Sequence, residues 1–259
     1  DVYKRQIVTR HDVEILPVPV DDNGLDITSG IQNYPDARFA LITPAHQSPL
    51  GVALSLARRH QILEWADRSQ AWIIEDDYDS EFRYHGKPLP ALKSLDAPQR
   101  VIYAGTFSKA LFPALRCAWL VLPVKQIAQF RHQASLAPCA VPVLWQNTLA
   151  DFLREGHFWR HLKKMRQHYA QRRQWIEQAL TQQGFQVVPQ KGGIQMVIRM
   201  IGDDIAHARK ANAAGLAVQA LSDWRIRSSG EGGLLLSFTN IVNEGMARQV
   251  AQQLRKALS

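Results

Sequence analysis

Two stretches decide the fold: residues 72–84, WIIEDDYDSEFRY, and residues 101–116, VIYAGTFSKALFPALR. Each opens with a short apolar run, at 72–74 and at 101–104, and polar side chains follow each run. In an α/β protein such runs are buried parallel strands, and reactive side chains collect just beyond their carboxyl ends. The two stretches therefore predict neighbouring parallel strands that share one site at their ends.

The polar residues after the two runs form a candidate site. They are Asp76, Asp77 and Tyr78 after the first run, and Thr106, Ser108, Lys109 and Arg116 after the second. Pyridoxal phosphate needs a lysine amine for its aldimine and an acid that keeps its ring nitrogen protonated, so that the ring accepts electrons from a carbanion. A phenol can hydrogen-bond the ring oxygen, and hydroxyls and a guanidinium can hold the phosphate. The set therefore predicts a pyridoxal phosphate site.

Each of these residues also has an ordinary explanation when it is taken singly. A Ser-Lys pair is typical of a surface, an Asp-Asp pair of a solvated turn, and an Arg after a Pro of a salt bridge. The order of the residues, and their position after two apolar runs, favours one common site over three unrelated explanations.

The same stretches resemble a known family. EDDYDSEFRY at 75–84 and GTFSKALFPALR at 105–116 resemble the aminotransferase-like domain of MocR regulators. These regulators belong to the GntR superfamily and join a winged helix-turn-helix to a fold-type-I aminotransferase domain. TPAHQSPLG at 43–51 is similar to the segment TPxHQxPTG of that family. The resemblance runs from residue 13 to the C-terminus and is strongest over 44–123.

The resemblance implies roles for the candidate residues. Lys109 would form the aldimine, Asp76 would pair with the ring nitrogen, and Tyr78 would bind the ring oxygen. The phosphate would be held by Thr106, Ser108 and Arg116. In fold-type-I enzymes an Asn of the loop that matches 43–51 also binds the cofactor oxygen, and in this chain that region holds Gln47 and Ser48, either of which is a candidate.

One departure from the pattern concerns the substrate. Aminotransferases that bind an α-carboxylate place an Arg in the strand before the last helix, and Leu235 matches that position here. Arg225 or Arg227 could supply a guanidinium from the preceding segment instead. The alternative for both is a surface salt bridge.

The resemblance implies an α/β fold, that of fold-type-I pyridoxal-phosphate-dependent transferases. Most of a large domain with a mostly parallel sheet is expected over 1–156, a connecting long helix over 157–183, and a smaller C-terminal α/β domain over 184–259. The expected elements are strands over 13–20, 37–43, 118–122, 185–188, 194–200, 217–221 and 234–238, and helices over 27–34, 52–67, 124–133, 141–155, 203–214 and 243–258. The helix over 52–67 should bury Leu56, Leu63 and Ala66.

The family's domain begins upstream of the first residue, so the chain is expected to be an N-terminally truncated fragment. The absent part would include a Gly-rich helix start that gives backbone amides to the phosphate, and an aromatic residue that stacks on the ring.

Composition narrows the class of protein. With 259 residues, 46% apolar and 21% charged, the chain resembles a soluble globular protein, and no apolar stretch is long enough to cross a membrane. Cys117 and Cys139 lack metal-site spacing, which favours packing roles, no metal, and a reducing cytoplasm. The net charge is +8, and seven basic residues lie from Arg154 to Arg173, six of them on the expected long helix. They form either a solvated face or a surface that steers DNA bound by a missing N-terminal winged-helix module.

Two functions of different class fit these observations. The first is an effector domain of a DNA-binding regulator, a homodimer that senses pyridoxal phosphate, an amine or amino acid, or both, and that transaminates slowly or not at all. The second is a catalytically active class I/II aminotransferase. Both use the same pocket chemistry. The regulator is favoured by the residues of the three motifs and by Leu235, which stands where aminotransferases place an Arg. A decayed domain without cofactor is disfavoured because every matched pocket residue is present.

Overall fold

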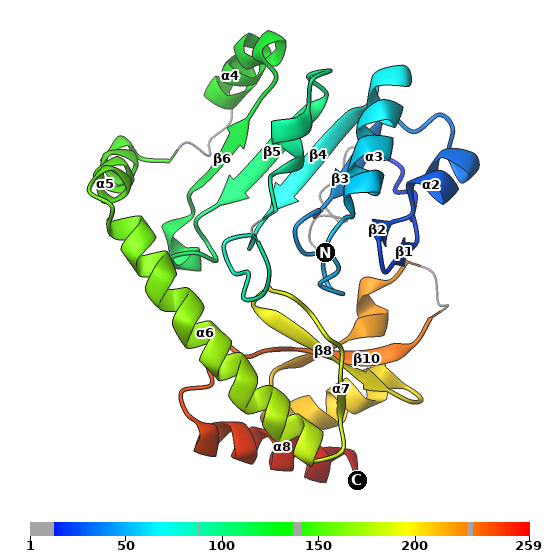
Figure 1. Ribbon diagram of the computed structural model, residues 1–259, viewed down its shortest axis with the longest axis vertical. Helices are drawn as coiled ribbons and strands as arrows, with labels where there is room; N and C mark the ends of the chain where they lie inside the picture. Colours follow the sequence, from blue (N-terminus) through cyan, green and yellow to red (C-terminus); the bar gives the residue numbers. More distant parts are fainter. Residues whose placement is uncertain (1–12, 88, 137–140, 227–229) are drawn as a thin grey trace.

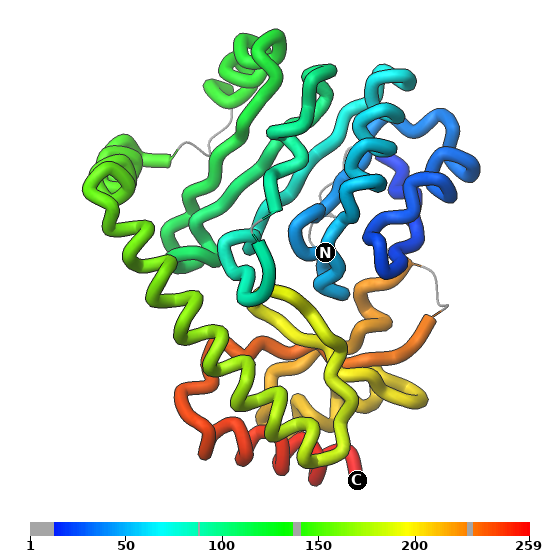
Figure 2. Tube along the Cα trace, in the orientation of Figure 1, coloured from blue at the N-terminus to red at the C-terminus, as the bar shows by residue number. Residues whose placement is uncertain are grey.

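The computed structural model describes residues 13–87, 89–136, 141–226 and 230–259. It contains two four-stranded sheets, one above the other in Figure 1, and the helix α6 (His157–Gln182) runs along one side of both. Figure 2 shows α6 descending from α5 (Val143–Arg154), beside the first sheet, to α8 (Glu244–Leu258), beside the second. The molecule is therefore an α/β structure in two parts that share one long helix.

The first sheet contains both stretches that decide the fold. Its strands are β3 (Phe39–Ile42), β4 (Trp72–Asp77), β5 (Val101–Thr106) and β6 (Ala118–Val121), in that order. β4 is parallel to β3 and to β5, and β6 is antiparallel to β5. The prediction that 72–74 and 101–104 begin neighbouring parallel strands is confirmed. Both strands continue past their apolar runs, so that Asp76 and Asp77 still lie within β4.

The two faces of this sheet differ. On one face Ile73 and Val101 are fully buried in a cluster with residues of α3 (Leu56–Arg68). On the other face Leu41 and Leu120 are each 50% exposed. Because successive strand residues point to opposite faces, Asp77 lies on the covered face with Ile73, and Asp76 lies on the open face with Leu41 and Leu120.

The second sheet is antiparallel, in the order β7-β8-β10-β9. Its strands are β7 (Gln186–Val187), β8 (Gln195–Met200), β9 (Val218–Ala220) and β10 (Gly232–Ser237). α6, α7 (Asp204–Ala213) and α8 contribute to the core that packs on it, which includes the fully buried Ile176, Leu180, Ile198, Leu234 and Phe238. Asn243 caps α8, since its Oδ1 accepts a hydrogen bond from Met246 N at 2.8 Å.

The expected strand over 13–20 is wrong for most of its length. Only Val20–Asp21 is a strand, β1, and it pairs antiparallel with β2 (Gly24–Leu25) across a tight turn. Pro17 and Pro19 lack the N–H groups that a strand needs for its ladder of hydrogen bonds, which explains why the strand does not extend toward residue 13.

The helix expected over 52–67 begins later than predicted. Ser55 is its N-cap, with a side chain that accepts from Arg58 N, and α3 therefore starts at Leu56. Leu56 is 62% exposed, so the expectation that it shares the buried face is wrong, whereas Leu63 and Ala66 are buried as expected. Leu56 occupies the first turn, ahead of the apolar positions that contact β4.

The remaining helices lie near their expected positions. They are α2 (Ile27–Asn33), α4 (Ile127–Leu136), which directly follows a short 3-10 turn at Val124–Gln126, and α5. In the part of the chain that the structure describes, no helix has the length and apolar character required to span a bilayer.

The basic side of α6 is partly used inside the molecule. Arg166 donates to Glu81 O, Arg172 to Thr239 O and Arg173 to Gly192 O. Arg173 is buried, and its guanidinium lies 6.0 Å from the ring centroid of Tyr84. These three arginines thus tie α6 to the segments around residues 81, 192 and 239, and Arg173 is buried while Arg166 remains exposed.

Candidate functional site

Asp76 and Asp77 have different surroundings although they are adjacent. Asp77 accepts hydrogen bonds from Tyr103 Oη at 2.8 Å, Ser80 Oγ at 2.7 Å and Ser80 N at 3.1 Å. Asp76 is half-buried on the opposite, open face, where the strand register places it beside Ala104 of β5. Asp77 is therefore committed to supporting the turn after β4, and Asp76 is the carboxylate that faces the candidate site.

Tyr78 follows β4 directly and reaches the loop at 43–51. Its Oη donates to His46 O at 3.2 Å, and it also hydrogen-bonds the side chain of Ser48. Burial, aided by the nearby Asp79 carboxylate, raises the pKa of Tyr78 well above its usual range, so the phenol keeps its proton. The Gln47 amide bonds Ser48 O and Leu50 N within its own loop, which leaves Ser48 as the side chain of this pair that lies against Tyr78.

The turn after β5 gathers the hydroxyls and the lysine. Thr106 Oγ1 lies 3.0 Å from Ser108 Oγ and accepts from Ser108 N at 3.1 Å. Thr106 points to the open face, as Asp76 does, because it stands two residues beyond Ala104. Lys109 is exposed, and among the described residues its ammonium makes no hydrogen bond or ion pair.

Arg116 returns to this turn through the β5–β6 connection. Phe107 N donates to Cys117 O at 3.1 Å, so Arg116 comes back alongside Ser108. Its backbone adopts a left-handed conformation with φ 50°, which costs a residue with a Cβ atom about 1 kcal/mol or more. The side chain is exposed. Strain at an exposed arginine beside two hydroxyls is typical of a ligand site.

The substrate-side candidates lie in the second part of the molecule. Leu235 is buried in a cluster with Val197 and Leu221, and Leu50 from the first part packs against it. The Arg225 guanidinium donates to Glu231 O. Arg227 lies outside the described residues. An apolar contact therefore occupies the strand position at which a carboxylate-binding Arg was sought.

The donor set fits pyridoxal phosphate. The ends of β4 and β5 combine a carboxylate, a protonated phenol, two adjacent hydroxyls, a lysine outside every internal ion pair of the described chain, and a strained arginine. A carboxylate suits a pyridinium nitrogen, and the hydroxyl and guanidinium donors suit a phosphate. These residues can bind, orient and electrostatically stabilise such a group.

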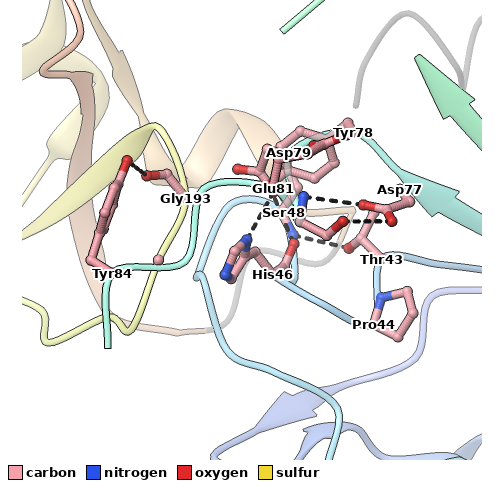
Figure 3. Close-up of polar contacts among 12 residues, drawn as sticks. Thr43, Pro44, His46, Ser48, Asp77, Tyr78, Asp79, Glu81, Tyr84 and Gly193 are labelled. Atoms are coloured by element: carbon pink, nitrogen blue, oxygen red, sulfur yellow. Dashed lines mark hydrogen bonds and ion pairs between the residues drawn. The ribbon is translucent and has the colours of Figure 1, made fainter. Parts of the chain in front are cut away.

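Two residues that sequence reasoning passed over complete the surroundings of Tyr78. His46 Nδ1 and Asp79 Oδ1 lie 2.9 Å apart, and the two side chains are 3% and 2% exposed (Figure 3). Both lie within the quoted motifs, 33 residues apart. Their positions in TPAHQSPLG and EDDYDSEFRY could have marked each of them as a candidate site residue. No rule of sequence spacing indicates that the two side chains meet.

Comparison with known proteins identifies the class. Residues 4–230 match the model of the family "Aminotransferase class I and II", and the chain belongs to that family. Its fold is that of fold-type-I aminotransferases. The kynurenine aminotransferase of Pyrococcus horikoshii is 25% identical with a TM-score of 0.84, over 94% of this chain and 63% of that one. LysN, an α-aminoadipate aminotransferase of Thermus thermophilus solved with N-(5'-phosphopyridoxyl)-L-leucine, has a TM-score of 0.84 at 25% identity, over 95% of this chain and 65% of that one.

Curated relatives narrow the resemblance within the family. The probable rhizopine catabolism regulatory protein MocR of Rhizobium meliloti is 35% identical over 94% of this chain and 50% of its own length. The pyridoxine biosynthesis transcriptional regulator PdxR of Corynebacterium glutamicum is 32% identical over 95% of this chain and 53% of its own length. The chain spans about half the length of these relatives.

Proposed function

We propose that this chain is the effector domain of a DNA-binding transcription regulator, and that it binds pyridoxal phosphate together with an amine or amino acid. The observation that carries the proposal is the grouping of Asp76, Tyr78, Lys109 and Arg116 around the ends of β4 and β5. Similarity to regulators over 94–95% of the chain supports the regulatory part.

In this proposal each residue has one task toward the cofactor. Lys109 attaches it covalently, Asp76 keeps its ring nitrogen protonated, and Tyr78, with Ser48 beside it, hydrogen-bonds its ring oxygen. Its phosphate is held by Thr106, Ser108 and Arg116. When bound, the cofactor supplies an electron sink for bonds at the ligand's amine-bearing carbon.

The same proposal extends to the organisation of the whole protein. The first sheet with its helices is the large cofactor-binding domain (1–156), α6 is the connection (157–183), and the second sheet is the small domain (184–259). DNA is bound through a winged-helix module N-terminal to this chain, as in a MocR-type regulator. The protein works in the cytoplasm as a homodimer.

An active aminotransferase is the second candidate. It is favoured by the 27% identity to the aromatic-amino-acid aminotransferase 1 of Thermococcus litoralis over 66% of the chain. Against it stands the apolar cluster around Leu235, since a transaminase orients an α-carboxylate with a rigid bidentate arginine. Arg225, bonded to the backbone of Glu231, would hold a carboxylate less rigidly than an arginine in the strand.

A turnover experiment on the full-length protein separates the two candidates. With pyridoxal phosphate bound, a panel of amines and amino acids should produce a change in the visible spectrum with at least one member, while steady-state transamination stays well below the roughly 10 per second typical of enzymes. Turnover at enzymatic rates that is lost in Arg225→Met, and kept in the control Arg209→Met at an exposed residue of α7, would establish the aminotransferase instead. The absence of a visible band in the wild type would reject the cofactor assignment.

A further inference from the structure

His46, Tyr78 and Asp79 form a closed ring of contacts. The Asp79 carboxylate bonds the His46 ring at 2.9 Å, and the Tyr78 phenol donates to the His46 carbonyl at 3.2 Å. Tyr78 and Asp79 are consecutive residues, so the His46 ring binds the carboxylate next to Tyr78 while the His46 backbone carbonyl accepts a hydrogen bond from the Tyr78 phenol. Figure 3 shows His46 under the Tyr78–Asp79 turn, with a dashed line joining the ring to the carboxylate. The Tyr78 side chain is therefore held at its hydroxyl group and, through the neighbouring Asp79, at its backbone.

A segment of the second part of the molecule closes over this ring of contacts. We call residues 190–194 the strap. Gly193 N donates to Phe82 O at 2.8 Å, Tyr84 Oη donates to Gly193 O at 3.0 Å, and Gln190 Nε2 donates to Leu50 O at 2.9 Å. The strap is thus bonded both to the segment after β4 and to the loop at 43–51.

The strap also contacts the histidine–aspartate pair directly. Ile194 N donates to the Asp79 carboxylate. A Cβ atom on Gly192 would lie only 2.4 Å from His46 Nε2 and 2.6 Å from Phe82 O, so a side chain there would force the strap away from the histidine. The position of the strap and the position of His46 are consequently linked.

The His46 ring is placed to hold other groups and not to react. Its Nε2 is buried and has no hydrogen-bond partner among the described residues, and Gly192 lies against it. Burial raises the pKa of the Asp79 carboxyl, and the hydrogen bond from His46 opposes that rise. A neutral imidazole that donates from Nδ1 to a carboxylate satisfies this geometry, because it leaves no charged N–H group buried without an acceptor.

We propose that His46 and Asp79 are a positioning pair for the cofactor site, which holds Tyr78 in place and links that phenol to the strap of the small domain. The inference rests on the proposed function, because Tyr78 matters to a ligand only if the cofactor binds beside it. Movement of the strap would shift His46, and through His46 the phenol. Binding of the cofactor to Tyr78 would in turn favour one position of the strap.

The proposal has a spectroscopic consequence with a definite sign. With the cofactor bound, the Tyr78 phenol would turn its single proton from the His46 carbonyl to the cofactor's ring oxygen. That hydrogen bond withdraws charge from the ring oxygen and lowers the pH midpoint at which the visible band of the bound cofactor is lost. Misplacing the phenol should therefore raise this midpoint. If the Asp79 carboxylate instead acted directly through its charge, removing that charge would lower the midpoint, since a nearby anion favours the protonated form of the bound cofactor. The two explanations predict opposite shifts.

The experiment titrates the visible band of the full-length protein in Asp79→Asn and His46→Ala. We expect the midpoint to rise by about 1–2 pH units, the scale of one hydrogen bond to a charged group. His46→Asn keeps an N–H donor at the position of Nδ1 and should restore a midpoint near that of the wild type. Asp67→Asn, on the exposed side of α3, is the matched control and should leave the midpoint unchanged.

A double-mutant cycle with Tyr78→Phe shows whether the pair acts through the phenol. In the Tyr78→Phe background, Asp79→Asn should produce no further shift. A shift that persists there, a lowered midpoint, or a loss of thermal stability with no shift at all would overturn the proposal. If Asp79→Asn does not fold, the comparison of His46→Ala with His46→Asn decides.

The two levels of inference fail in different ways. A wild-type protein that shows no visible band with pyridoxal phosphate rejects the proposed function, and the positioning pair with it. A wild-type band that is lost in Lys109→Ala but unchanged in Asp79→Asn and His46→Ala rejects the positioning pair alone.

Discussion

Replacing Asp76 by Asn tests which of two adjacent carboxylates serves the cofactor. The substitution preserves the shape of the side chain and removes its negative charge on the open face of the first sheet. A hydrogen bond between charged groups contributes about 1–3 kcal/mol, so the dissociation constant for pyridoxal phosphate should rise about 5- to 150-fold. Fluorescence titration of the cofactor-free protein measures this directly. Urea unfolding of the same protein should change little.

Asp77→Asn is the matched variant and should show the opposite pattern. Its carboxylate accepts three hydrogen bonds, from Tyr103 Oη, Ser80 Oγ and Ser80 N, and an amide can accept only at its single oxygen. The free energy of unfolding should fall by about 1–3 kcal/mol, while cofactor affinity stays close to the wild-type value. If Asp77→Asn weakens the cofactor and Asp76→Asn does not, the assignment of the two faces to two tasks is wrong.

Three further predictions address the lysine, the core and the pH dependence. Lys109→Ala should abolish the cofactor adduct trapped by borohydride, detected by intact mass, and an adduct on another lysine would contradict the pocket assignment. Buried Arg59 donates to Leu54 O, Pro44 O and Pro90 O, so Arg59→Met should lower the free energy of unfolding by about 2–4 kcal/mol, whereas Arg68→Met, at a 76% exposed side chain, should change it by less than about 0.5 kcal/mol. Burial raises the pKa of Glu81 to about 7, so the folded state holds a proton that the unfolded state releases near its usual pKa. The free energy of unfolding should therefore fall as pH rises from about 4.5 to about 7 and level off above about 7. Urea unfolding at several pH values measures this free energy, and its decrease with pH should be smaller in Glu81→Gln than in the wild type. An identical decrease in the two proteins would exclude Glu81 as its source.

The positions of the main strands could be predicted from the sequence because burial of short apolar runs is a local signal. The runs at 72–74 and 101–104 gave the two central strands, and the choice of Asp76 over Asp77 follows from strand alternation once the strand is known to reach residue 77. The sequence pattern did not show that β4 extends into its acidic residues. Glu75 can be buried in the strand because its carboxylate accepts hydrogen bonds from the backbone N–H groups of Leu92 and Lys93, which lie in a turn distant in sequence.

Contacts between distant segments could not be predicted. Nothing in the spacing of His46 and Asp79 indicates that they meet, because two loops at the end of a sheet bring them together. The same holds for part of the basic side of α6: the count of basic residues indicates a charged face, and it does not show that Arg166, Arg172 and Arg173 donate to backbone carbonyls, which only the tertiary structure supplies. The periodicity of apolar residues indicates which face of an element is buried, and it does not indicate which polar groups of other segments contact that element.

The left-handed backbone of Arg116 has a consequence for how this chain would respond to selection. A glycine at position 116 would relieve the backbone strain, by about 1 kcal/mol, but would remove the guanidinium that the proposed phosphate site needs. A library of variants sorted for resistance to heat should therefore accumulate Gly or Asn at this position, and the same library sorted for retention of pyridoxal phosphate should reject them. Stability and binding would rank the same substitutions in reverse order.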